Sequence, residues 1–230
     1  MVVENWLTRK LNSNAWNITL VLVALLMFGS LIFLHQFFGA ESWMPASYES
    51  VFKNHEYWRL WTTLFAHADP AHLLGNLFLF IPFAYFLTGY FGVLLFPLLG
   101  FVVGGLINAL TLTTLSGAST LIGVSGVVHW MGATWVTLYL LIDQREPTQR
   151  RILKSIGASL ILFIPTSFKP EISYLTHFLG YISGVISGAA FYFLNRKAFL
   201  AAVKFKIIKE EDEALPQADE EHFFDSTGMN

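Results

Sequence analysis

The stretch that decides the fold is LSGASTLIGVSGVVHW, residues 115–130, where an uncharged loop rich in Gly, Ser and Thr runs into an apolar helix. Ser125 lies at this junction, within the segment GVSG. A serine in this setting has two alternative roles. It is a small residue that lets two membrane helices pack closely, or it is a nucleophile held at membrane depth. The side chains that the rest of the chain brings to it decide between these roles.

The composition of the whole chain is that of a membrane protein. Of its 230 residues, 54% are hydrophobic and only 13% are charged, which is too apolar for a soluble domain of this length. The chain has no cysteine, which excludes disulfides, thiolate nucleophiles and cysteine metal ligands. We therefore predict an all-α membrane protein whose surroundings are the lipid bilayer, with no nucleic-acid partner.

Six segments are apolar and long enough to cross a bilayer, which takes about 20 mostly apolar residues. They cover residues 18–38, 72–90, 92–115, 125–142, 152–168 and 173–194. The aromatic-rich connection after the first span, roughly residues 39–71, is expected to fold as a partly buried interfacial loop. We predict an N-terminal segment over 1–17, a six-helix membrane domain over 18–195, and a tail over 196–230 that is first basic, then acidic and disordered.

The positions of the basic residues predict the orientation of these spans. With the N-terminus in the cytoplasm, eleven of the 14 Lys and Arg residues fall in cytoplasmic segments, and only Lys53, Arg59 and Lys169 fall outside. We therefore expect both termini in the cytoplasm, and the short basic N-terminus suits a bacterial inner membrane. The second, fourth and sixth spans then all start near the outer face.

This topology gathers four polar side chains near the outer face. His72 and Asn76 open the second span, Ser125 opens the fourth, and His177 lies at the start of the sixth. Polar groups are costly at membrane depth, so they mark a functional site by default. A histidine beside the serine would activate it, while the start of the fourth helix, with His72 and Asn76, would stabilise an oxyanion. Because no acidic residue is close to His177 in the sequence, we expect a Ser–His dyad.

Small residues lie on the faces that carry the serine and the histidine. His177 is followed by glycines at offsets of three, seven and eleven, and Ser125 shares a face with His129 and a glycine, with a second glycine adjoining it. Such faces allow two membrane helices to approach closely. The glycines expected to make this contact are Gly126, Gly132, Gly180, Gly184 and Gly188.

Four motifs together resemble those of the rhomboid intramembrane serine proteases, over roughly residues 18–195. They are WR at 58–59, HADPAHLLGN at 67–76, GVSG at 123–126 and HFLGYISG from residue 177. The resemblance implies that Ser125 is the nucleophile, that His177 is the base, and that His72 and Asn76 help to hold the oxyanion. It implies as substrates the transmembrane segments of membrane proteins, cut near the outer face where small and helix-weakening residues occur, with no cofactor.

Three features depart from the pattern that the resemblance implies. His129 stands where many relatives carry a tyrosine, Thr176 stands where alanine is common, and the second and third spans lack a glutamate. His129 is either a competing base for Ser125 or a residue that packs on the base and tunes its pKa, and we expect the latter role. His67 is expected to hydrogen-bond in its loop. A zinc site is not expected, because there is no HExxH pair and no acidic residue at a ligand spacing.

Two other functions fit a membrane protein of this size. A rhomboid-like chaperone or adaptor would bind client helices without cutting them, and loss of the serine or histidine would be its expected mark, yet this chain has both. A small transporter would favour internal repeats and charged residues at the membrane midplane, and the sequence shows neither. The intramembrane serine endopeptidase is the function that the sequence favours.

Overall fold

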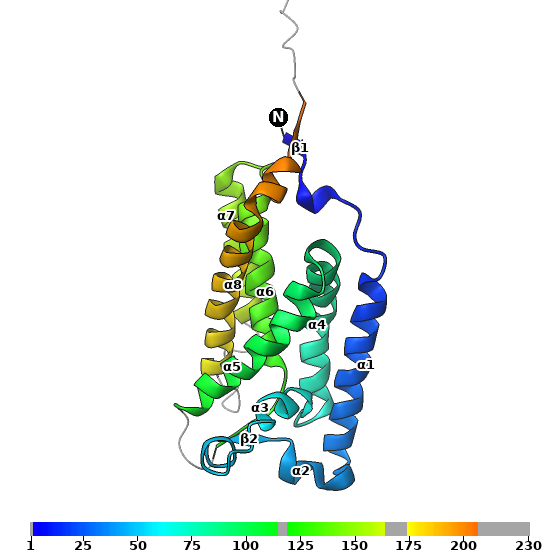
Figure 1. Ribbon diagram of the computed structural model, residues 1–230, viewed down its shortest axis with the longest axis vertical. Coiled ribbons are helices and arrows are strands. Elements are labelled where there is room, and N and C mark those ends of the chain that lie inside the picture. The colour runs from blue at the N-terminus through cyan, green and yellow to red at the C-terminus, as the bar shows by residue number, and fades with distance from the viewer. Residues whose placement is uncertain (1, 115–118, 164–173, 207–230) are drawn as a thin grey trace, which may run out of the picture.

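The computed structural model describes residues 2–114, 119–163 and 174–206, and it confirms the predicted all-α membrane architecture (Figure 1). Within these residues, five helical segments are long and apolar enough to cross a membrane. They are α1 (Ala15–Leu34), α4 (Pro70–Phe91), the segment Leu94–Leu112 made of η5 (Leu94–Leu99) and α5 (Gly100–Leu112), α6 (Ser125–Ile142) and α8 (Tyr174–Ala201).

A sixth long helix, α7 (Thr148–Phe163), lies at the position of the predicted fifth span. Its 16 described residues are fewer than a span of about 20 needs. The rest of the predicted span, 164–168, falls outside the described residues, as does the acidic part of the tail. The arrangement is compatible with six spans, five of which meet the criteria for length and hydropathy within the described chain.

Several helix ends differ from the sequence expectation for local reasons. α4 begins at Pro70, because Asp69 caps it by accepting a 2.8 Å hydrogen bond from the His72 backbone N–H, and proline is favoured in the first turn. The third span is broken at Phe96, whose φ of −143° is not helical, directly before Pro97. α8 continues to Ala201, so residues 196–201, which were assigned to the tail, are helical.

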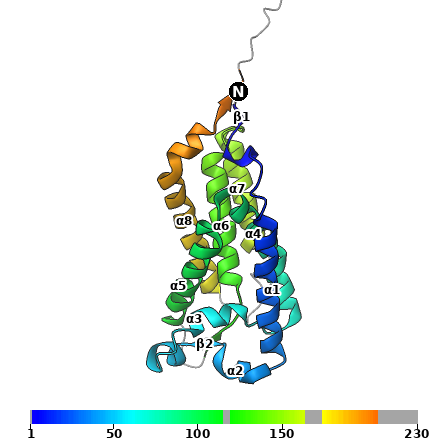
Figure 2. The same ribbon diagram turned by 45° about the vertical axis from the view of Figure 1, so that its right-hand side comes forward.

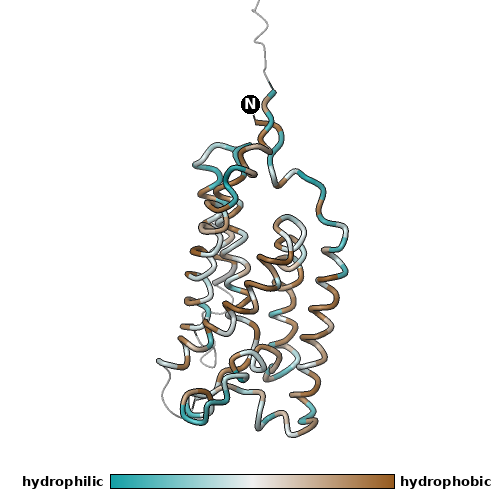
Figure 3. The backbone as a smooth tube through the Cα atoms, viewed as in Figure 1, coloured by the Kyte–Doolittle hydropathy of each residue, from teal (hydrophilic) through white to brown (hydrophobic). Residues whose placement is uncertain are grey.

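The helices run alternately up and down, and α4, α6 and α8 start at the same end of the bundle (Figures 1 and 2). α6 is the most buried of the candidate spans and contacts α4, α5, α7 and α8. The outer helices carry apolar residues along their length, and polar residues gather at the two ends (Figure 3). We call the end where α4, α6 and α8 start the Ser125 end.

The segment between α1 and α4 folds across the Ser125 end as the predicted partly buried loop. It consists of short elements: η2 (Phe37–Gly39), α2 (Ala40–Trp43), β2 (Ala46–Ser47), η3 (Glu49–Lys53), α3 (Arg59–Thr62) and η4 (Thr63–Phe65). Arg59 is only 9% exposed, and its guanidinium bonds to the Glu56 carboxylate and the Pro45 carbonyl oxygen. β2 pairs with β3 (Thr120–Leu121), so the loop is tied to the chain that enters α6.

At the opposite end, the N-terminal segment packs onto the bundle. β1 (Val2–Glu4) pairs with β4 (Lys204–Phe205), and η1 (Trp6–Thr8) follows. The Asn5 side chain donates a 2.8 Å hydrogen bond to Asp143 at the end of α6. The Arg145 guanidinium, hydrogen-bonded to the same carboxylate, holds the pKa of Asp143 below its usual value. The two ends of the described chain are thereby joined beside the ends of α6 and α8.

Candidate active site

Ser125 and His177 lie within hydrogen-bond distance of each other. Ser125 is the first residue of α6, and its hydroxyl Oγ is 2.9 Å from Nε2 of His177, in the first turn of α8. The His177 side chain is 4% exposed, and its Nδ1 is buried without a hydrogen-bond partner among the described residues. Since Nε2 faces the hydroxyl, this ring can accept the serine proton if the other nitrogen carries the ring hydrogen.

Glycines on α8 allow the close approach that brings the two side chains together. A Cβ atom added at Gly180 would overlap the carbonyl oxygen of Gly126, and one at Gly184 would overlap that of Trp130. At Gly188 an added Cβ would lie 3.0 Å from the Thr134 carbonyl oxygen. The backbones of α6 and α8 are therefore in direct contact along three turns, as the glycine spacing predicts.

Side chains also form hydrogen bonds between the two helices along this contact. The Thr134 hydroxyl donates a 3.2 Å hydrogen bond to the Gly184 carbonyl, and the Trp130 indole N–H donates a 3.0 Å bond to the Ser187 hydroxyl. Gly132, the remaining glycine of the predicted set, is buried in α6. These hydrogen bonds fix the axial shift of α8 relative to α6, which the glycines alone do not fix.

His129 lies against the ring of His177. The two rings are stacked, with their centroids 4.0 Å apart and their planes 12° apart. Nδ1 of His129 donates a 2.8 Å hydrogen bond to the Ser125 carbonyl oxygen, one turn back along α6. The ring is thus held by its own helix and supports one face of His177, while the serine hydroxyl points to His177. In this geometry the ring of His129 packs on the ring of His177, and its Nδ1 is engaged with the Ser125 carbonyl oxygen.

His72 and Asn76 lie beside the start of α6, against Gly123. A Cβ added at Gly123 would lie 2.9 Å from Cε1 of His72, 3.0 Å from its Nε2 and 3.9 Å from the amide Nδ2 of Asn76. The Asn76 side chain is 8% exposed, and its Nδ2 is buried with no hydrogen-bond partner in the described part of the chain. Two side-chain donors therefore flank the residues just before Ser125.

The start of α6 supplies backbone donors to the same place. Its N-cap residue, Val124, makes no side-chain capping hydrogen bond. The first N–H groups of a helix have no partner within the helix, and they carry the positive end of its dipole. These groups lie at the same helix start as Ser125, and such groups favour a negatively charged oxygen.

Gly123 and Thr63 are two residues of the site whose importance the sequence analysis missed. Gly123 has a φ of +104°, and its N–H donates a 2.9 Å hydrogen bond to the Thr63 carbonyl. The Thr63 hydroxyl, in turn, donates to the Leu121 carbonyl. The loop before α6 is therefore fixed by η4. The first glycine of GVSG was the available signal, but a positive φ is not visible in a sequence.

His67 is fully buried in the turn between η4 and α4, where its Nδ1 lies 2.9 Å from the Ser30 hydroxyl of α1. Its ring meets that of His72 edge to face, with centroids 5.0 Å apart. Burial, and then the nearby His72, lower the pKa of His67 to about 4. His67 is therefore neutral at physiological pH. It contacts Ser30 of α1 with Nδ1 and the ring of His72 with its own ring.

Among the residues that the structure describes, no group of three or more histidine, aspartate and glutamate side chains is arranged to hold a metal ion. Thr176, the residue before the base, packs its methyl group against Gly126, where an added Cβ would lie 2.8 Å away. The Thr176 methyl group therefore occupies the space that Gly126, which has no side chain, leaves beside Ser125.

Comparison with protein families matches the chain to one domain family. The family described as "Rhomboid domain" matches residues 54–193, which is more than half of the chain and includes His72, Asn76, Ser125, His129 and His177. Comparison with curated proteins found no match.

Proposed function

The chain belongs to the rhomboid family, and from this premise we propose that it is a serine endopeptidase that cuts the transmembrane segments of other membrane proteins near the outer face. The observation that carries the proposal is the 2.9 Å contact between Oγ of Ser125 and Nε2 of His177, at the start of two helices in direct backbone contact. A serine that only helped two helices to pack would not need a buried histidine aimed at its hydroxyl.

In the proposed reaction, the Ser125 oxygen attacks the carbonyl carbon of the scissile peptide bond, and its proton passes to Nε2 of His177. The tetrahedral intermediate collapses as the histidinium returns this proton to the leaving amine, which leaves an ester between Ser125 and the substrate. A water molecule, deprotonated by His177, then attacks the ester and regenerates the free hydroxyl. No acidic partner for His177 is used, so the pair acts as a dyad.

The oxyanion of the intermediate is held by the start of α6 and by two side chains. The uncapped N–H groups of the helix, the His72 ring and the buried Asn76 amide are the donors in this proposal. Removal of one such donor typically lowers kcat by roughly 100- to 1,000-fold. His129 holds the plane of the base by stacking, which replaces the orienting role of a third catalytic group.

The orientation of the protein is proposed from its basic residues. With eleven of the 14 Lys and Arg residues in cytoplasmic segments, both termini face the cytoplasm and the Ser125 end faces outward. Water reaches the ester from that side, where Ser119 and Thr120 before α6 are exposed. A bacterial inner membrane is the proposed location. The substrate helix must unwind at the site, because a helical carbonyl is already hydrogen-bonded.

The proposal is tested by labelling the purified protein with a fluorophosphonate probe and by following cleavage of a transmembrane substrate. We expect Ser125→Ala and His177→Ala to abolish labelling and to lower cleavage by at least about 1,000-fold. Ser119→Ala, a serine of the adjacent loop that is exposed, is the matched control and retains both activities. The helical circular dichroism of each variant shows whether it is folded.

A folded wild-type protein that neither reacts with the probe nor cleaves any substrate would refute the endopeptidase. If such a protein still bound transmembrane segments, the result would favour the chaperone or adaptor of the same family. Labelling that persists in Ser125→Ala would place the nucleophile elsewhere.

A further inference from the structure

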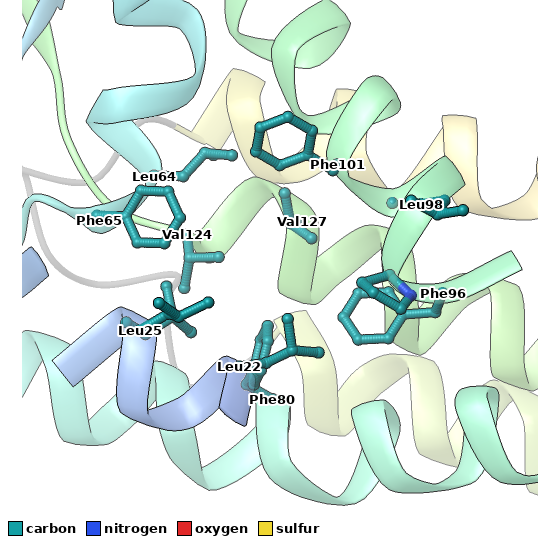
Figure 4. A pocket seen from close by; sticks show the side chains of 13 residues that line it. Leu22, Leu25, Leu64, Phe65, Phe80, Phe96, Leu98, Phe101, Val124 and Val127 are labelled. Carbon is teal, nitrogen blue, oxygen red and sulfur yellow. The ribbon is translucent and has the colours of Figure 1, made fainter. Parts of the chain in front are cut away.

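A cavity of about 270 Å³ lies on the side of α6 that faces α1. Its wall is formed by apolar residues from five parts of the chain, several of them shown in Figure 4. α1 contributes Leu22, Leu25 and Leu26, η4 contributes Leu64 and Phe65, α4 contributes Phe80, and the third span and the start of α6 complete it. No charged side chain and no side-chain hydrogen-bonding group lines it, so its occupant must be a hydrocarbon.

The cavity is separate from the candidate active site. Val124 and Val127 form its wall on α6, and they are 3% and 5% exposed. At about 100° per residue, Val127 points roughly 200° away from Ser125 around the helix axis. The catalytic face of α6 is directed to α8, whereas the cavity lies against α1, so an occupant does not contact the Ser125 hydroxyl.

The mouth of the cavity opens within the membrane. Leu25, Leu98 and Phe101 line the cavity and are also about half exposed, at 50%, 55% and 48%. Leu25 is the eleventh of the 20 residues of α1, so it lies halfway along a candidate span and at the depth of the lipid tails. The wall is thus continuous with the lipid-facing surface of α1 and of the third span.

We propose that this cavity is a binding site for one acyl chain of a membrane phospholipid. A closed apolar cavity of about 150 Å³ already binds benzene and stays free of water, so one nearly twice as large and open to lipid tails accommodates a segment of alkyl chain. Lipid tails are the only hydrocarbon present along its whole mouth. A substrate helix, about 10–12 Å across with its side chains, is too bulky for a cavity of about 270 Å³.

The bound chain supports the loop that leads into α6. Leu64 and Phe65 follow Thr63, whose carbonyl accepts the 2.9 Å hydrogen bond from Gly123, and Val124 directly precedes Ser125. An acyl chain that fills the cavity packs against all three side chains and thereby limits their movement. The lipid would act on the active site through this packing, without touching the reacting atoms.

The experiment is photolabelling of the full-length protein in phosphatidylcholine vesicles that contain a small fraction of phosphatidylcholine with a diazirine midway along one acyl chain. After irradiation, mass spectrometry maps the adducts. We expect adducts on Val124, Val127 or Phe65 of the wild type, which lie inside the cavity, in addition to adducts on exposed lipid-facing residues. This readout does not depend on proteolysis, so it stands or falls separately from the proposed function.

Two pairs of variants give the control. Leu25→Trp plugs the mouth from α1, and we expect its cavity adducts to fall to the level of samples that were not irradiated. Leu20→Trp, at a residue of α1 that is 48% exposed and does not line the cavity, should keep the wild-type pattern. Leu98→Trp plugs the mouth from the third span. Its control is Leu106→Trp, at a residue that is 57% exposed and does not line the cavity. If Leu25→Trp does not fold, the adducts of Leu98→Trp test the proposal instead.

The proposal is overturned if the wild type carries adducts only on exposed residues, or if the plugged variants keep adducts on the cavity residues. A photoreactive transmembrane substrate peptide is tested in parallel. If this peptide labels Val127 and the lipid does not, the cavity belongs to the substrate and the lipid site is refuted.

Discussion

The two sides of α6 are built in different ways. Toward α8, glycines bring the backbones into contact, and Gly180 and Gly184 leave no room for one further carbon atom, while Gly188 leaves little. Toward α1, apolar side chains of α1, η4, α4 and the third span, together with Val124 and Val127, enclose a cavity of about 270 Å³. The side that carries the Ser125–His177 pair is close-packed and joined by hydrogen bonds, whereas the other side keeps a space at its centre.

The two kinds of contact differ in how many arrangements they allow. A backbone contact has few alternative arrangements, so it holds a donor and acceptor 2.9 Å apart on two separate helices. Side-chain contacts can rearrange as rotamers change, so the α1 side can adapt to lipid. Substitutions on the two sides of α6 should therefore have unequal effects.

The largest effect is expected for Gly180→Ala. The added methyl group overlaps the Gly126 carbonyl oxygen, so α8 must move away from α6, and His177 lies only one turn earlier. Overpacking typically destabilises by about 1–3 kcal/mol, and misplacing a catalytic group by 1 Å costs roughly 100-fold in rate. Gly157→Ala on α7 is the matched control, since nothing lies within 4 Å of its added Cβ.

Thermal unfolding and substrate cleavage measure both effects of Gly180→Ala. Gly188→Ala, where the added Cβ would be 3.0 Å from the Thr134 carbonyl oxygen, should lose less thermal stability and less cleavage activity than Gly180→Ala. If Gly180→Ala cleaved as fast as the wild type, the close backbone contact would not be what positions the base.

The next effect concerns His67, which is fully buried beside Ser30 of α1. Its pKa of about 4 lies below the usual value of 6.5, so the unfolded chain takes up a proton first as the pH falls. The stabilisation from a neutral His67 is complete above pH 6.5 and is lost as the pH falls toward 4. Between pH 7.5 and 5, the contribution of His67 to the free energy of unfolding in mixed micelles should fall by roughly 2 kcal/mol.

His67→Gln should remove the part of the pH dependence that comes from His67 and make the slope shallower than that of the wild type, although it lowers stability at pH 7.5. The free energy of unfolding of the wild type and of His67→Gln is compared at each pH. An identical slope in the wild type and in His67→Gln would show that His67 is not the titrating group.

A smaller effect is expected when the ring stacked on the base is changed. His129→Phe keeps an aromatic ring 4.0 Å from His177 but loses the hydrogen bond to the Ser125 carbonyl, whereas His129→Ala loses both. Aromatic pairs contribute about 0.5–1.5 kcal/mol, so we expect His129→Ala to lower kcat by roughly 2- to 10-fold and His129→Phe to lower it less. A loss in His129→Ala as large as that in His177→Ala would instead make His129 a base.

The smallest effect is expected on the α1 side itself. Leu25→Ala enlarges a cavity that already opens to lipid, and Leu25 is half exposed, so the free energy of unfolding should change by less than about 0.5 kcal/mol in vesicles. Cleavage should also stay near the wild-type rate. A loss equal to that of Gly180→Ala would mean that the two sides of α6 are equally constrained.

The sequence predicted the parts of the fold that depend on local composition. Hydrophobic runs predicted the spans, and the polar residues at their starts predicted that His72, Ser125 and His177 lie at one end. The glycine spacing after His177 also predicted which face of α8 meets α6, because a helix places residues three and four apart on one side. The contact of Gly180 with Gly126 follows from this spacing.

Other features could not be predicted, because they depend on residues far apart in the chain. Nothing local to Gly123 shows that Thr63 fixes its N–H and that the His72 ring lies over it. The break of the third span at Phe96 and the folding of the N-terminal segment onto Asp143 were missed for the same reason.

Composition and helical spacing were enough to identify a membrane protein, the approximate positions of its spans, and the polar side chains that share one end. These properties follow from hydropathy and helical periodicity, which act over a few residues at a time. Only the tertiary structure decided that Oγ of Ser125 lies 2.9 Å from Nε2 of His177, that His129 stacks on that ring, and that a cavity opens toward α1. These depend on how helices rotate and slide against each other, which is set by the packing of all their side chains together.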